Sequence, residues 1–517
     1  MNLPIIELGE TRFSLFDCAA MVAGTRHVCL SPAARARITR SRVIVERYAA
    51  GDEPIYGLNT GLGGNLAHRL SPSEISAFQA QLVRGRCIGV GEPLPLETCR
   101  AALLARIVST ATGTSGLSQG SVDLLVAMFN AGVTPIIPAR GSISSADLGL
   151  SAHIGAVAIG RGRAWFGGDA LSGIEALARA GLKPVDLAPK DGLALCNNPV
   201  PSVGHGVMTL ANLADTLLLA SAVAAMACEG YGANPQIFDA RLHDARPAPG
   251  QQQAAGLFRS LLAGSSLHEQ PRNIQDAISF RTLAPVMGAA FAAFGTARDC
   301  VEIELNGMAD SPLVLLEDGV MLSSPSFHTA AMALAFDTLA ISLSHLATAS
   351  AYRLFKLMNP ALSGLPKYLS PVGGASAGYV PMQKTIAALQ AEIRLSTTPA
   401  SLDALAVSDT VEDHAPQTLL TIRKLANQLV PFRLLIAIEA LVAAQAVDLR
   451  DGLRLGPITA RLHQTIRNLV PRLETDREPG EDAMRLHDHI FQVDVVAWLR
   501  KDTADLSLSF TPESKTA

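Results

Sequence analysis

The sequence predicts a mainly α-helical fold, and three observations support this prediction. Long segments rich in alanine and leucine dominate the chain, and most carry apolar residues at spacings of three and four, which is typical of helices with a buried face. Hydrophobic residues make up 49% of the chain and charged residues 17%, a composition that fills a large core and is too apolar for a disordered protein. At 517 residues the chain is several times the size of a single-core domain, so we expect several substructures or one large helical body.

The expected helices are, in chain order, residues 122–128, 211–228, 330–358, 382–393 and 418–449. The longest apolar stretch is shorter than the roughly 20 residues that a membrane span needs, so we expect a buried core helix there and no membrane contact. Breaks rich in glycine, proline and serine fall at 56–65, 136–146, 197–206, 323–326 and 371–378. Loops held by rigid helices often carry function, so a site is expected there. A charged stretch at 474–481 precedes a last helical segment, and 511–517 is expected to be a frayed tail.

Composition also bounds the function. Lys and Arg total 42 and Asp and Glu total 46, and no run of like charge suggests nucleic acid or anionic lipid as a partner. A small-molecule substrate is therefore expected. The 7 cysteines are scattered and never paired at metal-ligand spacing, so we expect no metal and a reducing, cytoplasmic location. The first residues have neither a basic segment nor a long apolar core, so no secretion signal is expected and the mature chain is expected to start here.

Six polar or glycine-punctuated segments carry the strongest functional signal. They are Tyr56-Gly-Leu-Asn-Thr-Gly-Leu-Gly63, Gly89-Val-Gly-Glu-Pro-Leu94, Gly141-Ser-Ile-Ser-Ser-Ala-Asp-Leu148, Gln275-Asp276 with Arg281, Asn306 with Asp310 and Pro312, and Glu412-Asp-His414. In this order they resemble the aromatic amino acid ammonia-lyase family, which includes histidine, phenylalanine and tyrosine lyases. The resemblance implies an ammonia-lyase-like fold with a long central helical bundle and a smaller N-terminal part. It also implies a homotetramer whose sites combine loops from several subunits.

The same resemblance predicts two domains and several roles. Residues 1–195 would form the N-terminal part with the catalytic tyrosine loop and the triad loop, and residues 196–517 the central bundle and C-terminal helices. Tyr56 matches the family's catalytic base. A phenol titrates near 10, so it needs nearby positive charge or donors to remove a carbon-bound proton. Seen alone, Tyr56 could equally anchor a glycine-rich turn.

Three further residues match the family's substrate contacts. Arg281 matches its carboxylate-binding arginine, whose planar fork suits a bidentate grip on an amino-acid carboxylate. Seen alone, Arg281 would be an ordinary ion pair. Asn197 and Asn306 match polar asparagines near the substrate, and either could instead be a turn residue that satisfies its own backbone.

The prosthetic group of the family is methylidene-imidazolone (MIO), which forms when an Ala-Ser-Gly triad cyclises. Here the aligned triad is Ser144-Ser145-Ala146, and the surrounding stretch is one residue shorter than the family pattern. Ser145 keeps the hydroxyl that must be lost, but Ala146 replaces the glycine whose missing Cβ allows the compressed turn. Cyclisation is therefore disfavoured, and a serine that caps the following helix is the alternative.

Replacements around the ring-binding residues bear on the substrate. Glu412 falls where histidine lyases carry a glutamate that faces the imidazole. Arg86 takes the place of a histidine that meets the ring, and it could donate to a thione-like acceptor or form a salt bridge. Lys384 could pair with Glu412 or reach solvent along its stem. Phe327 and Tyr379 are candidates to face a quaternary ammonium.

These features together predict a carbon-nitrogen lyase for an aromatic, imidazole-bearing substrate. Ammonium is a poor leaving group without the prosthetic electrophile, whereas a trimethylammonium group leaves unaided as a neutral amine. The altered triad therefore favours elimination of trimethylamine from ergothioneine to give thiolurocanate, the reaction of ergothionase, with no cofactor. Tyr56 would take the β-proton, while Glu412, with Arg86 or Lys384, would hold the ring. Two alternatives stay open: an ammonia-lyase for histidine or another aromatic amino acid with an MIO group, and a catalytically silent relative kept for binding or assembly.

Overall fold

The computed structural model describes residues 5–24, 26–269, 272–402 and 405–503, which form two compact units. Unit 1 comprises Met1–Ala211, Ala297–Phe336 and Pro399–Arg423, and unit 2 comprises Asn212–Thr296, Asp337–Thr398 and Lys424–Ala517, each in its described parts. Both units are discontinuous along the chain. Residues 1–195, which the sequence predicts as the N-terminal part, fall within unit 1. The expected tail at 511–517 lies outside the described residues.

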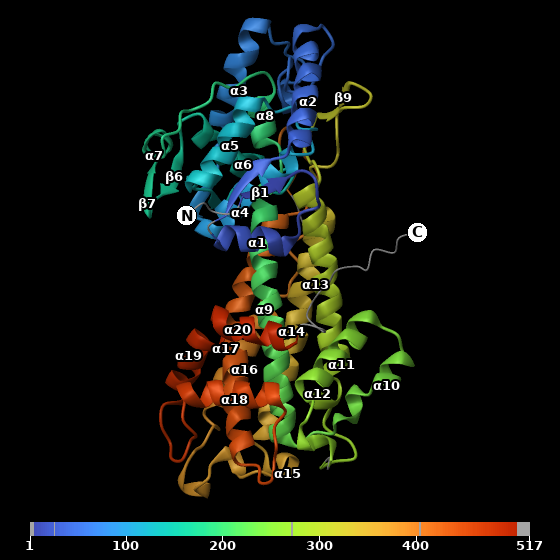
Figure 1. Cartoon of the computed structure of the whole chain (residues 1–517), viewed down its shortest axis with the longest axis vertical. Coiled ribbons are helices and arrows are strands. Elements are labelled where there is room, and N and C mark those ends of the chain that lie inside the picture. The colour runs from blue at the N-terminus through green and yellow to red at the C-terminus, as the bar shows by residue number, and fades with distance from the viewer. Residues whose placement is uncertain (1–4, 25, 270–271, 403–404, 504–517) are drawn as a thin grey trace. The chain divides into compact units, whose positions relative to one another are not determined.

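Four long helices contribute to both units (Figure 1). They are α9 (Val200–Tyr231), α13 (Leu283–Asn306), α14 (Ala330–Leu357) and α17 (Thr418–Asp448). The mainly α-helical prediction is thereby confirmed, because these helices contain three of the expected segments: α14 and α17 match theirs almost to the ends, and α9 extends beyond the expected 211–228 at both ends. The other two expected helices are α5 (Gln119–Ala131) and α16 (Met382–Leu395).

Unit 1 contains short strands as well as helices. Its further helices are α1 (Leu15–Ala23), α2 (Pro32–Ala50), α3 (Pro72–Arg86), α4 (Leu96–Thr110), α6 (Leu148–Ala158), α7 (Gly173–Arg179) and α8 (Asp191–Cys196). Its strands are β1 (Ile5–Leu8), β2 (His27–Leu30), β3 (Val90–Pro93), β4 (Thr134–Pro135), β5 (Pro138–Arg140), β6 (Arg163–Phe166), β7 (Asp169–Ser172), β8 (Leu313–Leu315) and β9 (Val320–Leu322). β1 and β2 pair in parallel, whereas β3–β5, β4–β6–β7 and β8–β9 are antiparallel.

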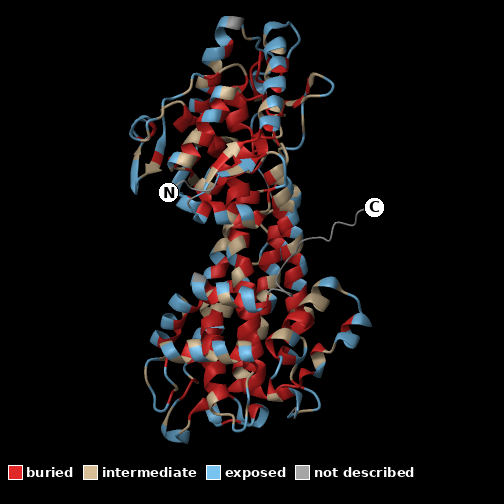
Figure 2. Cartoon of the chain, viewed as in Figure 1, coloured by how far each residue is buried: buried red, intermediate tan, exposed pale blue. Residues whose placement is uncertain are grey.

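Unit 2 is helical throughout its described elements. Beside its parts of the long helices it contains α10 (Ala240–Asp244), α11 (Pro249–Leu261), α12 (Ile278–Arg281), α15 (Pro360–Ser363), α18 (Pro457–Leu469), α19 (Pro479–Ile490) and α20 (Val493–Asp502). Within this unit α9 and α17 pack closely, because a Cβ on Gly230 would lie 2.9 Å from the Ala446 side chain. Arg353 of α14 and Glu439 of α17 form a buried ion pair at 2.6 Å. Figure 2 shows these helices buried along most of their length.

The expected break at 197–206 is wrong over most of its length, because α9 already begins at Val200. A Cβ on Gly204 would lie 2.4 Å from the amide nitrogen of Ala102, so this glycine allows α9 to pack against α4. A Cβ on Gly206 would meet the Met332 side chain at 2.8 Å. Glycines that indicated a loop therefore serve close helix packing.

Three helical stretches are long and apolar enough to cross a membrane by length and composition, namely Asp191–Tyr231, Ala330–Leu357 and Thr418–Asp448. Their most apolar windows are 83%, 56% and 78% buried inside the protein. Packing in the protein core accounts for most of this hydropathy, since a lipid-facing helix would expose its apolar side chains instead.

Candidate active site

The loop that carries Tyr56 is fixed by its own backbone and by a neighbouring asparagine. Ile55 is buried in an apolar cluster that anchors the start of the loop. The Asn59 side chain accepts a hydrogen bond from the Ile55 amide at 2.8 Å and donates one to the Glu53 carbonyl at 2.8 Å. Tyr56 itself is half-buried, and its phenol oxygen accepts a hydrogen bond from the Gly63 amide at 3.2 Å. A donor at this oxygen stabilises the phenolate form that a tyrosine base needs.

A fully buried glutamine on α3, Gln79, joins the Tyr56 loop to α8. Its Nε2 donates to the Gly57 carbonyl at 3.2 Å, and its Oε1 accepts from the Leu193 amide at 3.1 Å. Gly57 has a φ of +65°, and a Cβ at this position would lie 2.6 Å from the Leu193 side chain. Glycine is therefore required directly after the tyrosine, because a larger residue would be strained and would clash.

A pocket of about 520 Å³ opens between the Tyr56 loop and α3. The loop contributes Gly61, Leu62, Asn65, His68 and Leu70, and α3 contributes Glu74, Ala77, Phe78, Gln81 and Arg86. Arg86 ends α3, and among the described residues its guanidinium makes no hydrogen bond or ion pair.

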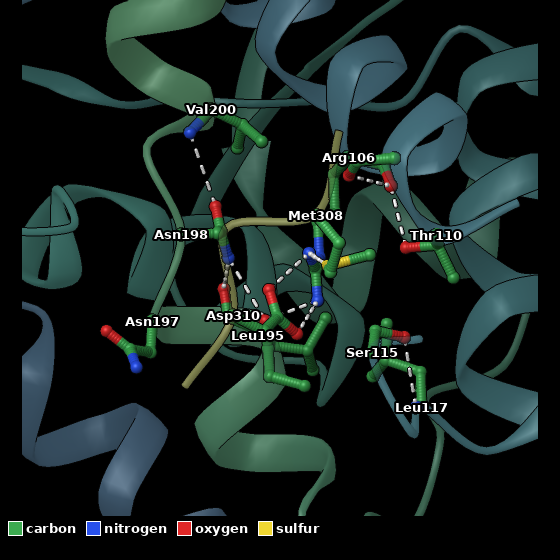
Figure 3. Close-up of polar contacts among 12 residues, drawn as sticks. Arg106, Thr110, Ser115, Leu117, Leu195, Asn197, Asn198, Val200, Met308 and Asp310 are labelled. Atoms are coloured by element: carbon green, nitrogen blue, oxygen red, sulfur yellow. Dashed lines mark hydrogen bonds and ion pairs between the residues drawn. The ribbon is translucent and has the colours of Figure 1, made fainter. Parts of the chain in front are cut away.

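Asn197 follows α8 and is 8% exposed. Its Nδ2 donates to the Ser311 carbonyl at 2.9 Å, which leaves the amide oxygen able to accept from a ligand. Figure 3 shows the Asn197 side chain pointing away from the Arg106 and Asp310 side chains, whereas Asn198 turns toward them. The two consecutive asparagines therefore differ in role. Asn198 is buried, and its Nδ2 donates to the carbonyls of Ala194 and Leu195.

A buried ion pair between Arg106 and Asp310 is hydrogen-bonded to α8. Arg106 and Asp310 are each 1% exposed. Nη1 and Nη2 of Arg106 donate to Oδ1 and Oδ2 of Asp310, each at 2.9 Å. Arg106 also donates to the Ala194 carbonyl of α8 at 2.6 Å. Lys190, at the start of the helix, is fully buried and donates to the Ser115 carbonyl; burial lowers its pKa to about 8, although Asp310 opposes the shift. The sequence singled out Asp310 but gave no reason to expect the two cations.

The Asn306 side chain is hydrogen-bonded to backbone groups inside the protein, as in the second reading that the sequence left open. Its Oδ1 accepts from the Phe13 amide at 2.7 Å, and its Nδ2 donates to the carbonyls of Phe13 and Glu302 at 2.8 Å each. Both amide hydrogens are thus used inside the protein. Asn306 clamps the start of α1, so we leave it out of the proposed substrate contacts.

The triad loop is held by hydrogen bonds on both sides. The Ser144 amide donates to Ser142 Oγ at 2.9 Å, and Ser144 Oγ accepts from the Leu419 amide at 3.0 Å. Ser144 and Ala146 have φ values of 64° and 66°, a left-handed conformation that residues with a Cβ rarely adopt. Buried Asp147 accepts from Ser142 Oγ at 2.6 Å, and burial raises the pKa of its carboxyl.

The Phe327 and Glu412 segments meet the triad loop within unit 1. An antiparallel bridge pairs Ser145 with His328, the residue after half-buried Phe327. His328 Nε2 and His414 Nδ1 lie 2.9 Å apart. The Glu412 carboxylate accepts from Ser408 Oγ at 2.7 Å. The loop that carries Glu412 also touches the loop after Tyr56, since a Cβ on Gly64 would lie 3.0 Å from an Asp409 carboxylate oxygen.

The remaining predicted residues lie in unit 2. Arg281 ends α12 and is exposed, and its Nη1 donates to Gln275 Oε1 at 2.8 Å. No carboxylate pairs with Arg281 among the described residues, so the ordinary ion pair is not found there. Lys384 is exposed on α16. Tyr379 is fully buried and 0% exposed, so it cannot face a ligand as the sequence suggested.

Tyr56, Arg86, Asn197, the triad and Glu412 lie in unit 1, whereas Arg281 and Lys384, which sequence reasoning placed in the same site, lie in unit 2. Sequence reasoning missed Gln79, Lys190 and the Arg106 pair, because single polar residues on apolar helices form no motif. Among the described residues, no group of three or more histidine, cysteine or acidic side chains could hold a metal ion.

Comparison with known proteins identifies the family. A model described as aromatic amino acid lyase matches residues 13–468. A histidine ammonia-lyase of Anaeromyxobacter sp. (strain K) is 39% identical over 487 residues, covering 92% of this chain and 96% of the relative. A histidine ammonia-lyase of Myxococcus xanthus (strain DK1622) is 35% identical over 509 residues, covering 98% and 100%.

Solved structures agree with this assignment. The ergothioneine-degrading ergothionase of Treponema denticola superposes with a TM-score of 0.91 at 30% identity, covering 96% of this chain and 99% of that chain. The histidine ammonia-lyase of Trypanosoma cruzi superposes with a TM-score of 0.87 at 29% identity, covering 98% and 96%. With the fold, the tyrosine loop and the triad loop in the family's order, the chain belongs to the aromatic amino acid ammonia-lyase family and is a carbon-nitrogen lyase.

Proposed function

We propose that this lyase eliminates trimethylamine from ergothioneine and produces thiolurocanate. The observation that carries the proposal is the triad loop, whose residues do not suit the family's prosthetic group. A lyase without that electrophile needs a substrate that brings its own good leaving group, and a trimethylammonium group departs as a neutral amine. The likeness to the ergothionase of Treponema denticola supports the same substrate.

The fit of MIO can be tested on the loop itself. Ring closure requires the Ala146 nitrogen to reach the Ser144 carbonyl carbon, in a turn that glycine at the third position makes accessible. Here Ala146 carries a Cβ and is 1% exposed, so a change in its backbone would have to displace packed neighbours. Ser144 is tied through its amide and its hydroxyl, and Ser145 through the bridge to His328. The residues of the triad loop therefore do not fit MIO.

In the proposed mechanism Tyr56, as phenolate, removes the proton from the β-carbon. The electron pair of that C–H bond forms the Cα=Cβ double bond, and the C–N bond breaks with its electrons leaving on trimethylamine. Arg281 holds the substrate carboxylate through its planar fork. Glu412 and Arg86, with Lys384 as a further cation, bind the thio-imidazole ring and stabilise charge that spreads into it. The amide oxygen of Asn197 accepts a hydrogen bond from the substrate, and Phe327 faces the quaternary ammonium of the substrate.

The alternative is an ammonia-lyase for histidine or another aromatic amino acid that still cyclises Ser144-Ser145-Ala146. The identity of 39% to a histidine ammonia-lyase favours it. The two proposals predict different amines, since one releases trimethylamine from ergothioneine and the other ammonia from histidine. We also propose that the enzyme is a cytoplasmic homotetramer, which the family resemblance and the 7 free cysteines support.

The intact mass of the purified chain should equal the mass calculated from its sequence. A deficit of two waters would show that the triad cyclises and would overturn the cofactor-free mechanism. Ser145→Ala is the matched variant, because it removes the hydroxyl that cyclisation must lose. We expect this variant to keep turnover of ergothioneine within about threefold, the scale of one lost hydrogen bond. Trimethylamine and ammonia are measured for each substrate, and if neither is released the silent binding role is favoured.

Arg281→Lys tests the carboxylate contact. A lysine keeps the charge but loses the bidentate fork, so KM should rise about tenfold or more while kcat changes less. Arg246→Lys is the matched control, because Arg246 is also exposed in unit 2 and donates to a glutamine oxygen, that of Gln251, at 2.7 Å. Equal KM values for both variants would contradict the assignment.

A further inference from the structure

Two histidines far apart in the sequence form a hydrogen-bonded pair beside the triad loop. His328 Nε2 and His414 Nδ1 lie 2.9 Å apart, and the ring centroids are 5.0 Å apart with a tilt of 34°. No role follows for either ring from the proposed mechanism. His414 is two residues from Glu412, and His328 is paired through its backbone with Ser145.

The pair lies where three segments of unit 1 meet. On the triad loop, the Ile143 carbonyl accepts from the Gln417 amide at 3.0 Å, and Ser144 Oγ accepts from the Leu419 amide at 3.0 Å. Thr329, directly after His328, and Thr418, four residues after His414, are buried, and their hydroxyls are hydrogen-bonded at 2.7 Å. The backbone at 417–419 is thus well fixed. The residues from 405 to 411 before it are exposed, and His414, bonded to His328, lies between this exposed segment and the fixed backbone.

A hydrogen bond between two imidazoles depends on their protons. One nitrogen must donate and the other must accept, so the bond exists when the two facing nitrogens share one proton. If both rings are fully protonated, both facing nitrogens carry a proton, so neither can accept, and the two positive rings repel each other. The pair therefore binds at most one added proton without losing its bond.

We propose that His328 and His414 are positioning residues that, through this hydrogen bond, hold the Glu412 loop against the triad loop, and that the hold fails when the pair takes up a second proton. The proposal rests on the proposed function only in assigning the substrate ring to Glu412. It identifies two residues that position the Glu412 loop without contacting the substrate, and it predicts a dependence of substrate affinity on pH.

The charges around the pair agree with this proposal. The pKa of His328 is lowered, first by burial and then by His414, while the main-chain carbonyls of the two histidines oppose the shift. The acidic groups on the segments around the pair are Glu412 and Asp413, next to His414, and Asp147 at the end of the triad loop. Burial raises the pKa of Asp147, which reduces its ability to stabilise a second proton on the pair. A lowered pKa means that the bond is intact at neutral pH and is lost as the pH falls through the pKa of His328.

The test compares two replacements of one residue. In His414→Asn the amide oxygen stands near the position of Nδ1, so it can accept from His328 whether or not His328 is charged. In His414→Leu no acceptor remains. For the enzyme as it exists, KM should rise as the pH falls through the pKa of His328, which lies below the ordinary value for histidine. The asparagine variant should keep the KM of the wild type at pH 8 and lose the rise at low pH. The leucine variant should show a KM about 3- to 10-fold higher at every pH, the loss of one hydrogen bond.

A second measurement needs no turnover. Exchange of the imidazole C2 hydrogen for deuterium, followed by mass spectrometry across pH, reports the pKa of each histidine in the full-length protein. The pKa of His328 should rise toward the ordinary value in His414→Asn, and backbone exchange at 405–412 should increase in His414→Leu but not in His414→Asn. An unchanged His328 pKa with unchanged backbone exchange would overturn the proposal even if ergothioneine is turned over. Conversely, if no substrate is turned over, these exchange data still decide whether the pair holds the loop.

Discussion

Tyr56→Phe is expected to lower kcat by about 10²- to 10⁴-fold, the usual contribution of a general base. The substitution removes only the phenol oxygen, the atom that accepts a hydrogen bond from the Gly63 amide at 3.2 Å. The rest of the loop should keep its shape, because Asn59 and Gln79 hold it through backbone groups on either side of the tyrosine. The loss should therefore appear in kcat, with KM for ergothioneine changed little.

The experiment measures the rate of trimethylamine release with saturating substrate. Tyr352→Phe is the matched control, because Tyr352 is 53% exposed on α14 and has no proposed role. Its kcat should equal that of the wild type. A Tyr56→Phe enzyme that keeps its kcat within a few-fold would exclude the tyrosine as the base and would move attention to the ionisable groups of the pocket, His68 and Glu74.

The fold was largely predictable because its signals are local and repeated. Apolar residues at helical spacing identified α14, α16 and α17 almost to their ends, since each buries one or more faces over many turns. The failure at 197–206 has the opposite cause. A glycine that allows two helices to pack and a glycine that forms a turn look alike in the sequence, and only the closeness of Gly204 to Ala102 distinguishes them.

The site was predictable where a motif carried it, and not where a side chain acts on another part of the chain. Arg86 and Glu412 were found through segments of several residues. Asn306 has a backbone partner 293 residues away at Phe13, which no local pattern reveals. Gln79 likewise bridges two backbone positions in different segments, so its role appears only when α3 and α8 are placed together.

The second large effect is expected in stability. Asp310→Asn should destabilise the protein by about 3–5 kcal/mol, because it leaves the Arg106 guanidinium buried without a counter-charge. Both side chains are 1% exposed, so water cannot replace the lost partner. The change is followed as a shift of the urea midpoint of unfolding. The matched control is Glu317→Gln, which breaks the exposed pair with Arg40 at 3.1 Å and should cost less than about 1 kcal/mol. Equal midpoints for the two variants would contradict a structural role for the buried pair.

A double variant separates stability from positioning. Arg106→Met combined with Asp310→Leu removes both charges, so most of the lost stability should return. The Ala194 carbonyl that Arg106 serves would keep its hydrogen bond from Asn198 Nδ2 at 3.0 Å, so it would not be left unsatisfied. The Ser311 carbonyl that accepts from Asn197 directly follows Asp310, and Arg106 links Asp310 to the Ala194 carbonyl of α8. If the double variant regains stability but its KM for ergothioneine is higher than that of the wild type, the ion pair positions Asn197 for the substrate. If both its stability and its KM match those of the wild type, the pair serves folding alone.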